Sequence, residues 1–337
     1  MNKQSQRILV VGPAWVGDMV MAQSLFITLK QHNPDVMVDV LAPAWSLPLL
    51  SRMPEVNEAI ALPVSHGELA LTTRFRVGRQ LRHKGYTQAI VIPRSFKAAL
   101  VPFFTGIPRR TGYRGEMRYG VINDMRALNK EVLTQTVQRQ VALGLPENTE
   151  QSPIIPYPRL EIDKNNQTRL IEKLELKLEK PIIGLMPGAE YGPAKQWPIA
   201  YYHELAGKLI LEGYQVWVFG SEKEHEIGAL IASVGAGVTN LCGATRLEDV
   251  VDLIALCDSV VSNDSGLMHV ACAADRRVIA IYGSSSPAYT PPLSQNAEVI
   301  YRYLECSPCF KRECPLGHTN CLNGIKVDEV RKIIISG

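Results

Sequence analysis

Residues 260–269, VVSNDSGLMH, combine residue types that suit the binding of an anion. They predict a buried strand that ends in polar residues, then a turn of small residues and the first turn of an apolar helix. Ser265 and Gly266 would leave the backbone N–H groups of that helix start uncovered, and such groups attract phosphate. The same residue types are also common as ordinary helix caps, so this stretch alone leaves both interpretations open.

Two further turns are expected at the same edge of a sheet. Residues 187–189, PGA, follow one predicted strand, and residues 220–222, GSE, follow another. Because the carboxyl ends of parallel strands meet at one edge, the three segments together predict a pocket for a phosphorylated ligand. Lys195 lies on a proline-flanked loop after the first of these strands, which makes it the expected clamp for a diphosphate. An ordinary surface lysine is the alternative.

A glycine-rich loop near the amino terminus presents an acid where a phosphate-binding loop would carry a lysine. This loop, GPAWVGD at residues 12–18, places Asp18 at the lysine position, and a carboxylate there would repel phosphate. The loop does not match the G-x-G-x-x-G pattern either, which disfavours a dinucleotide site. Asp18 at a helix start, kept ionised by the helix dipole, is therefore a candidate general base, with a simple helix cap as the alternative.

The distribution of charge is more informative than its total. A net charge of +3 does not by itself indicate nucleic-acid binding, and we expect no nucleic-acid partner. Residues 74–118, however, contain eleven Lys or Arg and a single acid, Glu116. Such an excess attracts phosphates, acidic sugars or anionic lipid head groups, although each residue alone could simply be solvated. Residues 109–118 are broken by glycines and are predicted to form a flexible, basic, anion-binding loop.

The seven cysteines fall into two groups, and all are expected to be reduced. Three lie in apolar contexts and are predicted to be core residues: Cys242, Cys257 and Cys272. The other four fall within sixteen residues that also contain His318: Cys306, Cys309, Cys314 and Cys321. Their spacing suits a structural Zn²⁺ or a redox-sensitive clip, but only the first pair has the common two-residue gap. Their state stays open, and we predict no metal.

Alternating strands and helices must position these residues. Apolar, β-branched runs predict strands at residues 7–11, 36–41 and 89–92, and the helix after Asp18 carries Met21, Leu25 and Leu29 on one face. Four prolines in residues 146–158 predict a linker. The chain is therefore expected to divide into domains 1–155 and 156–337, the second with the cysteine-rich tail.

The second half repeats the alternation. Strands are predicted at residues 182–186, 215–219, 260–263 and 278–282 with a further short strand, and helices at residues 170–178, 202–211, 223–234 and from a capping box at 245–248. The expected fold class is α/β, with two doubly wound, Rossmann-like domains facing each other across a cleft. This is the GT-B arrangement of glycosyltransferases, which some sugar epimerases share.

Three segments together resemble glycosyltransferase family 9: GPAWVGDM at 12–19, PGAEYGPAKQWP at 187–198 and NDSGLMH at 263–269. Segments 43–45, 49–60 and 114–120 are also similar, and the cysteine-rich tail departs from the best-known members. The resemblance implies inverting transfer of L-glycero-D-manno-heptose from ADP-heptose to the first heptose of the Kdo-lipid A inner core. No cofactor is expected, and no DxD-like pair suggests a metal.

Within that reaction Asp18 is the expected base, and Lys195 would stabilise the departing diphosphate. By resemblance, Glu222 contacts the ribose hydroxyls, with Glu224 as its rival, and Asp264 lies near the sugar. Further donor contacts are expected from Glu190, Tyr191, Ser265, Gly266 and His269. The anionic acceptor would be bound by Arg94, Lys97, Arg110, Arg114 and Arg118.

A polar amino terminus and the lack of an apolar run of about 20 residues predict a cytoplasmic protein. The glycolipid acceptor that the resemblance implies would place this protein at the inner face of the inner membrane, as a peripheral protein. Three alternatives remain open at this point. They are a family 9 heptosyltransferase with a different acceptor, a GT-B nucleotide-sugar epimerase or hydrolase, and a non-catalytic module that binds anions or a membrane.

Overall fold

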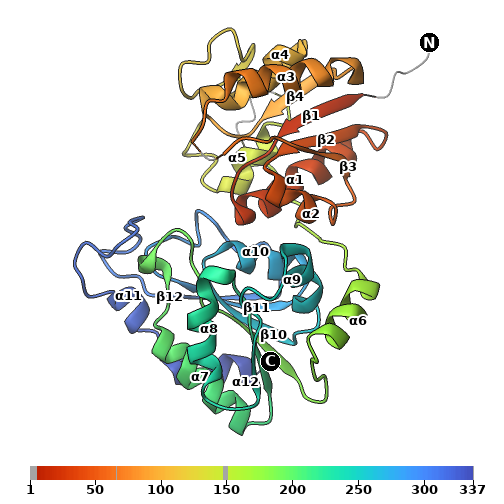
Figure 1. Cartoon of the computed structure of the whole chain (residues 1–337). Coiled ribbons are helices and arrows are strands. Elements are labelled where there is room, and N and C mark those ends of the chain that lie inside the picture. The colour runs from red at the N-terminus through yellow and green to blue at the C-terminus, as the bar shows by residue number, and fades with distance from the viewer. Residues whose placement is uncertain (1–5, 66, 147–150, 337) are drawn as a thin grey trace. The chain divides into compact units, whose positions relative to one another are not determined.

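The computed structural model describes residues 6–65, 67–146 and 151–336. It divides into two compact units, of which the first ends at Pro158 and the second begins at Arg159. In Figure 1 the first unit runs from red to yellow and the second from green to blue. Residues 1–5 of the polar amino terminus and residues 147–150 of the expected linker lie outside the described residues.

The first unit is built on six parallel strands in the order β3-β2-β1-β4-β5-β6 (Figure 1). Their bounds are β1 (Arg7–Val11), β2 (Met37–Ala42), β3 (Val56–Ala61), β4 (Gln88–Val91), β5 (Arg109–Tyr113) and β6 (Asp124–Arg126). Chain order reverses between β1 and β4, which are adjacent: Ile8 pairs with Val38 on one side and with Gln88 on the other. Ligands of such sheets bind outside the carboxyl ends of the strands at this reversal.

Helices cover both faces of this sheet. They are α1 (Val16–His32), α2 (Leu47–Leu50), α3 (Leu71–Leu81), α4 (Leu100–Thr105) and α5 (Thr136–Ala142), with short 3-10 turns η1 (Ala44–Ser46), η2 (Arg82–Lys84) and η3 (Phe96–Ala99). Helices α3 and α4 pack on each other, and Val77 and Val101 from them meet Leu9 of β1 in one buried cluster. Figure 1 shows α1 on the other face, where it packs against α5. Met21, Leu25 and Leu29 of α1 are buried as predicted.

The second unit repeats the plan with strand order β12-β11-β10-β7-β8-β9, again all parallel. Its strands are β7 (Ile182–Met186), β8 (Gln215–Val218), β9 (Val238–Asn240), β10 (Ser259–Asn263), β11 (Arg277–Tyr282) and β12 (Ala297–Tyr301). Here the order reverses between β7 and β10, which pair directly through residues such as Val261 and Leu185. The carboxyl ends of these two strands are the expected place for a ligand.

The helices of the second unit are α6 (Lys164–Lys173), α7 (Ile199–Leu211), α8 (His225–Ala232), α9 (Leu247–Ile254), α10 (Gly266–Ala273), α11 (Asn320–Asn323) and α12 (Val327–Ile335), with 3-10 turns η4 (Pro193–Lys195) and η5 (Glu222–Glu224). Leu205 of α7, Ile231 of α8 and Val330 of α12 pack with Val218 and Ile279 of the sheet in one core. Each fully buried side chain of this size stabilises the fold by about 1.5–3 kcal/mol. Among the described residues, no helix combines the length and apolarity that crossing a membrane requires.

Several sequence-based boundaries are wrong. Residues 109–118 are not a flexible loop, because the first five form β5 inside the sheet. The second sheet has six strands rather than five, since β12 forms its edge. Helix α6 begins at Lys164, where the Asp163 carboxylate accepts the N–H of Asn165 at 2.9 Å, and it ends at Lys173.

The predicted capping box at residues 245–248 is also misplaced by one residue. The carboxylate of Asp249, not that of Glu248, accepts the backbone N–H of Arg246 at 3.0 Å, and α9 begins at Leu247. Arg246 is therefore the cap residue. The shift leaves the helix itself where it was expected.

Candidate functional site

A lysine–aspartate ion pair lies at the reversal point of the second sheet. Lys195 belongs to η4 in the loop after β7, and Asp264 directly follows β10. The Lys195 Nζ lies 2.5 Å from Asp264 Oδ2, with side-chain exposures of 19% and 5%. Thr290 Oγ1 lies 3.5 Å from the other Asp264 oxygen. Because the pair is largely shielded from water, an arriving phosphate would compete with the carboxylate for a cation that is already positioned.

Asn263, the last residue of β10, holds the Lys195 loop at both of its ends. Its side chain is fully buried, and its Nδ2 donates to the carbonyl oxygen of Pro187 at 2.7 Å. Its Oδ1 accepts the backbone N–H of Trp197 at 2.9 Å and the hydroxyl of Tyr202 at 3.2 Å. Sequence reasoning gave no role to Asn263 or Tyr202. The sequence feature that could have indicated Asn263 is a polar amide at the end of an otherwise mostly apolar strand.

Trp197 anchors the same loop in the core of the second unit. Its indole ring is fully buried and meets the Tyr202 ring edge-on, with the ring centroids 4.9 Å apart. The indole N–H donates to the carbonyl oxygen of Ile325 at 3.0 Å. Packing against Tyr202 and the hydrogen bond of the indole N–H together fix the position of this ring. The proline-flanked loop that carries Lys195 is thus fixed to the fold immediately after the lysine.

The start of α10, next to this ion pair, is open to an anion. Ser265 is the cap residue with an extended backbone, φ −144° and ψ 171°, and its side chain makes no capping hydrogen bond. Its hydroxyl instead lies 3.3 Å from that of Ser262. Ser265 and Gly266 are partly exposed, unlike the rest of the strand end. Because Ser265 does not satisfy the first N–H groups of α10, the anion-site interpretation is favoured over an ordinary cap.

His269 lies beneath this helix start as a buried, neutral side chain. The pKa of His269 is lowered to about 4, chiefly by burial; the charge of Asp264 opposes this shift and that of Lys195 adds to it. Its Nδ1 has no hydrogen-bond partner within the described chain. At neutral pH this imidazole therefore adds no positive charge to the site. Its expected contact with the donor stays a prediction.

The two rival acids after β8 have different surroundings. The Glu224 carboxylate caps its own turn, accepting the backbone N–H of Ser221 at 2.8 Å and the Ser221 hydroxyl at 2.5 Å. Glu222 is exposed and lies against Gly243, where a Cβ would stand 2.1 Å from Glu222 Oε2. Gly243 also has a φ of +77°, so the position requires glycine. The contacts of Glu224 favour Glu222 as the ribose ligand.

Glu190 and Tyr191 flank the Lys195 loop. Glu190 forms an exposed ion pair with Lys223, with a distance of 2.8 Å between the charged atoms. The Lys195 Nζ lies 5.2 Å from the centre of the Tyr191 ring, within range of a cation–π contact. Tyr191 also donates its hydroxyl to the carbonyl oxygen of Phe310 at 2.9 Å. The tyrosine thus supports Lys195 from the side of the cysteine-rich tail.

Asp18 lies in the first turn of α1, directly after β1 of the first unit, as the glycine-rich loop predicts. The carboxylate is half-buried at the positive end of a helix of 17 residues, which favours its ionised form. Gln140 of α5 donates its side-chain N–H to the Asp18 carbonyl oxygen at 3.2 Å. The cap residue Trp15 is 45% exposed.

Three of the predicted acceptor ligands gather at the carboxyl edge of the same sheet. Arg94 and Lys97 follow β4, and Arg114 follows β5, which pairs with β4. The Arg94 guanidinium donates to the Arg114 carbonyl oxygen at 3.0 Å. Gly115 packs so closely that a Cβ would stand 2.1 Å from the Arg94 carbonyl oxygen. These contacts hold two of the three cations, Arg94 and Arg114, at the sheet edge where Asp18 also lies.

Arg118 and Arg110 are engaged by the fold instead. Arg118 is fully buried, donates to the carbonyl oxygens of Pro93, at 2.7 Å, and Tyr113, and burial lowers its pKa to about 10. The structure therefore contradicts the expectation that Arg118 meets the acceptor, because its guanidinium has no surface to offer. Arg110 donates to the carbonyl oxygen of Val121 at 2.6 Å and to two others.

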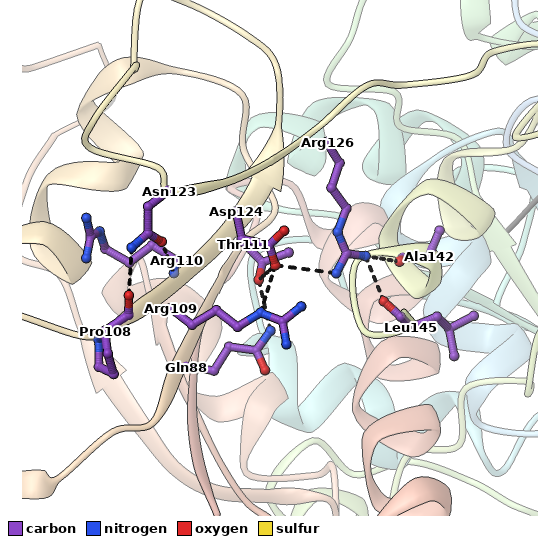
Figure 2. A network of polar contacts seen from close by, with 10 residues as sticks. All are labelled: Gln88, Pro108, Arg109, Arg110, Thr111, Asn123, Asp124, Arg126, Ala142 and Leu145. Atoms are coloured by element: carbon purple, nitrogen blue, oxygen red, sulfur yellow. Dashed lines mark hydrogen bonds and ion pairs between the residues drawn. The ribbon is translucent and has the colours of Figure 1, made fainter. Parts of the chain in front are cut away.

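An acid from outside the basic stretch offsets part of its excess. Figure 2 shows Arg109 paired with Asp124. The Arg109 Nε lies 2.8 Å from Asp124 Oδ2, and the Asp124 carboxylate also accepts the hydroxyl of Thr111. Arg126, which lies beyond that stretch, donates to the carbonyl oxygens of Ala142 and Leu145 (Figure 2). The ion pair of Arg109 makes the excess of cations from residues 74–118 smaller in the folded chain than in the sequence.

The cysteines are all free thiols, and Cys242, Cys257 and Cys272 are buried as predicted. Burial raises the pKa of the Cys242 and Cys272 thiols to about 12, so neither is a thiolate at neutral pH. These three sulfurs act as small apolar groups in the core. Of the four cysteines of the tail, Cys321 is buried and the other three are partly exposed.

Comparison with known proteins gives a consistent picture. The model of glycosyltransferase family 9 (heptosyltransferase) matches residues 74–320. The chain is 52% identical over 305 residues to lipopolysaccharide heptosyltransferase 2 of Salmonella typhimurium, covering 87% of each chain. It is 47% identical to lipooligosaccharide heptosyltransferase 2 of Haemophilus influenzae, covering 87% of this chain and 88% of that one.

A solved structure, that of the E. coli ADP-heptose LPS heptosyltransferase II, matches 98% of both chains with a TM-score of 0.88 and 45% identity. This match, together with the two parallel six-stranded sheets, confirms the expected GT-B fold class. Asp18 and Arg94 follow the two strands at the reversal of the first sheet, and Lys195 and Asp264 follow those at the reversal of the second.

Proposed function

Because the chain belongs to glycosyltransferase family 9, we propose that it transfers L-glycero-D-manno-heptose from ADP-heptose to the first heptose of the Kdo-lipid A inner core. The chain is a heptosyltransferase of that family, and its relatives are enzymes of lipopolysaccharide biosynthesis. The main support for a donor site is the largely buried ion pair of Lys195 and Asp264, next to the start of α10, where no side chain caps the helix. It offers a cation and free N–H groups to a diphosphate at one sheet edge.

The second unit, which begins at Arg159, is the proposed donor-binding domain. Lys195 turns from the Asp264 carboxylate to the diphosphate of ADP-heptose, and the N–H groups at Ser265 and Gly266 bind the same phosphates. Asp264, relieved of its lysine, then accepts a hydroxyl of the sugar. Glu222 binds the ribose hydroxyls, because Glu224 is engaged in capping its own turn. Glu190, Tyr191 and His269 border this donor site.

The first unit, which ends at Pro158, is the proposed acceptor-binding domain. An acceptor hydroxyl oxygen attacks the anomeric carbon of the heptose in line while the bond to the ADP oxygen breaks, which inverts the configuration. Asp18 takes the proton of that hydroxyl. Lys195 and the helix start stabilise the negative charge that develops on the leaving diphosphate. The step needs no cofactor, because the cation and helix start supply the charge stabilisation.

Arg94, Lys97 and Arg114 bind the carboxylates and phosphates of the acceptor. Arg110 is a secondary contact, since its guanidinium already donates to carbonyl oxygens. The acceptor is a glycolipid, so the enzyme works as a peripheral protein at the cytoplasmic face of the inner membrane. The cations at the sheet edge support this location, because anionic head groups attract them.

The purified protein tests this proposal with ADP-heptose and three acceptors that carry no, one or two heptoses. We expect the acceptor with one heptose to gain a single heptose unit, and the other two to react far more slowly. Preference for the acceptor with no heptose or with two heptoses would make the chain a family 9 enzyme with a different acceptor. Release of free heptose or an epimer from ADP-heptose alone would favour the hydrolase or epimerase. Failure to bind ADP in titration calorimetry would favour a non-catalytic module.

A further inference from the structure

The cysteine-rich tail is a long loop with little apolar packing. No helix or strand occurs in residues 302–319, between the end of β12 and the start of α11. Loops longer than about 12–15 residues without secondary structure are uncommon in compact domains and usually have a specific role. Leu304 packs against the core of the second unit, but Tyr303 is 89% exposed, Leu316 60% and Phe310 49%. Apolar packing therefore fixes one end of the loop, and polar contacts such as the hydrogen bond from the Phe310 N–H to the Ser284 carbonyl oxygen at 2.7 Å must fix the rest.

Four sulfurs are among the side chains of this tail that turn inward. Four cysteines line a single small pocket together with Ala194, Ser284, Pro315, Leu316, His318 and Thr319: Cys306, Cys309, Cys314 and Cys321. None of the four is exposed, although the loop around them largely is. The pocket holds about 20 Å³, which is room for one occupant the size of a water molecule. It is too small for a substrate and of a suitable size for one ion.

We propose that these four cysteines bind one transition-metal ion, Zn²⁺ or Fe²⁺, as a tetrahedral tetrathiolate site that fixes the loop of residues 302–319. Thiolate sulfur is the ligand that selects these ions, and four such ligands close the coordination sphere of a structural site. Among the described residues, no three potential ligands already surround a common point. The thiolates therefore converge by rotation of their side chains when the ion binds.

One local contact favours a site made of sulfur alone. The Nδ1 atom of His318 accepts the backbone N–H of Asn320 at 3.0 Å, so this nitrogen is already engaged within the loop.

The loop braces the segment that carries Lys195. The carbonyl oxygen of Arg312 accepts the backbone N–H of Ala194 at 3.0 Å, and that of Phe310 accepts the Tyr191 hydroxyl at 2.9 Å. Ala194 also lines the cysteine pocket itself and directly precedes Lys195. We therefore expect loss of the ion to weaken ADP binding about tenfold, a usual size for coupled sites. This consequence rests on the proposed function, whereas the metal site does not.

Metal analysis of the full chain tests the site directly. The protein is prepared in a reducing buffer without a metal-affinity tag, and its zinc and iron are measured by plasma mass spectrometry. We expect one equivalent of zinc or iron per chain, and the element found tells which. Cys309→Ser and Cys314→Ser should each lose it. Cys257→Ala is the matched control, because it removes a buried thiol outside the pocket and should keep the ion.

A second measurement covers variants that fold poorly. Co²⁺ added to the chelator-treated wild-type chain should give the intense visible absorption of tetrahedral cobalt thiolate, which Zn²⁺ should then displace. Metal well below one equivalent together with no cobalt spectrum would overturn the proposal. So would a metal content that both serine variants retain, or an intact mass under non-reducing conditions that shows disulfides. Failure of the metal-loaded wild type to bind ADP would refute only the donor site.

Discussion

Replacement of Asn263 by alanine tests whether one side chain holds the Lys195 loop. The substitution removes the donor to the Pro187 carbonyl oxygen and the acceptor of the Trp197 N–H, both of which are buried. The Tyr202 hydroxyl keeps a second partner, the carbonyl oxygen of Met186 at 3.2 Å. Two buried backbone groups are thus left unpaired at about 1–3 kcal/mol each, so we expect a loss of about 4 kcal/mol in the free energy of unfolding.

The same variant should lose donor affinity more than acceptor affinity. The two ends of the Lys195 loop would no longer be tied to β10, so Lys195 would be poorly placed for the diphosphate. Urea unfolding and steady-state kinetics with each substrate varied in turn measure both effects. The control is Asn296→Ala, which removes an exposed amide whose side-chain contact with Asp275 is 3.4 Å long. It should change stability by no more than about 0.5 kcal/mol.

The reasoning would be refuted if Asn263→Ala matched the control in stability and kept the wild-type KM for ADP-heptose. A stable variant with a raised donor KM would show that the amide positions the loop without contributing to the core. A destabilised variant with unchanged kinetics would show the reverse. Either mixed outcome would separate the two roles that the geometry assigns to Asn263.

The remaining predictions concern the acid, the acceptor cations and the buried histidine. Asp18→Asn should bind ADP normally and lower kcat by about 10²–10⁴-fold, the usual worth of a general base; a near-normal kcat would exclude Asp18 from that role. Charge reversal of Lys97 and Arg114 to glutamate should raise the acceptor KM far more than the ADP-heptose KM, and equal effects on both would remove them from the acceptor site. The pKa of His269 is lowered to about 4 from 6.5, so between these values the unfolded chain binds a proton that the folded chain does not. Stability should therefore fall by up to about 3 kcal/mol as the pH drops from 6.5 to 4, and His269→Gln should flatten that part of the stability profile measured by urea unfolding. An unchanged slope in His269→Gln would assign the acid sensitivity to other groups.

The sequence predicts the central strands β1, β4, β7 and β10 well, and β5 and the edge strand β12 poorly. Strands β1, β4, β7 and β10 are short apolar runs because helices cover both of their faces, and such runs are readable directly. The edge strand β12 has two exposed residues among five, and β5 begins with two arginines, so neither shows a buried pattern. Glycines in residues 109–118 then favoured a loop. Pairing with β4 and β6 overrides that local preference.

The candidate site divides in the same way. Asp18, Lys195 and the α10 start were predicted because each belongs to a short segment whose residue types carry chemistry. The pairing of Lys195 with Asp264 was not, because 69 residues separate them and only the adjacency of β7 and β10 brings them together. The burial of Arg118 was missed for a similar reason. Its partners are backbone carbonyl oxygens, which every residue has, so the amino-acid sequence does not indicate them.

The most direct test of the account is the mass of the product formed from ADP-heptose and the acceptor that carries one heptose, with the wild-type chain and Lys195→Met assayed in parallel. The account predicts an acceptor heavier by one heptose unit and one ADP released per transfer. It also predicts a rate for the lysine variant that is about 10²–10³-fold lower, the usual loss when one charge-stabilising donor is removed. An acceptor of unchanged mass, or a variant as fast as the wild type, would contradict it.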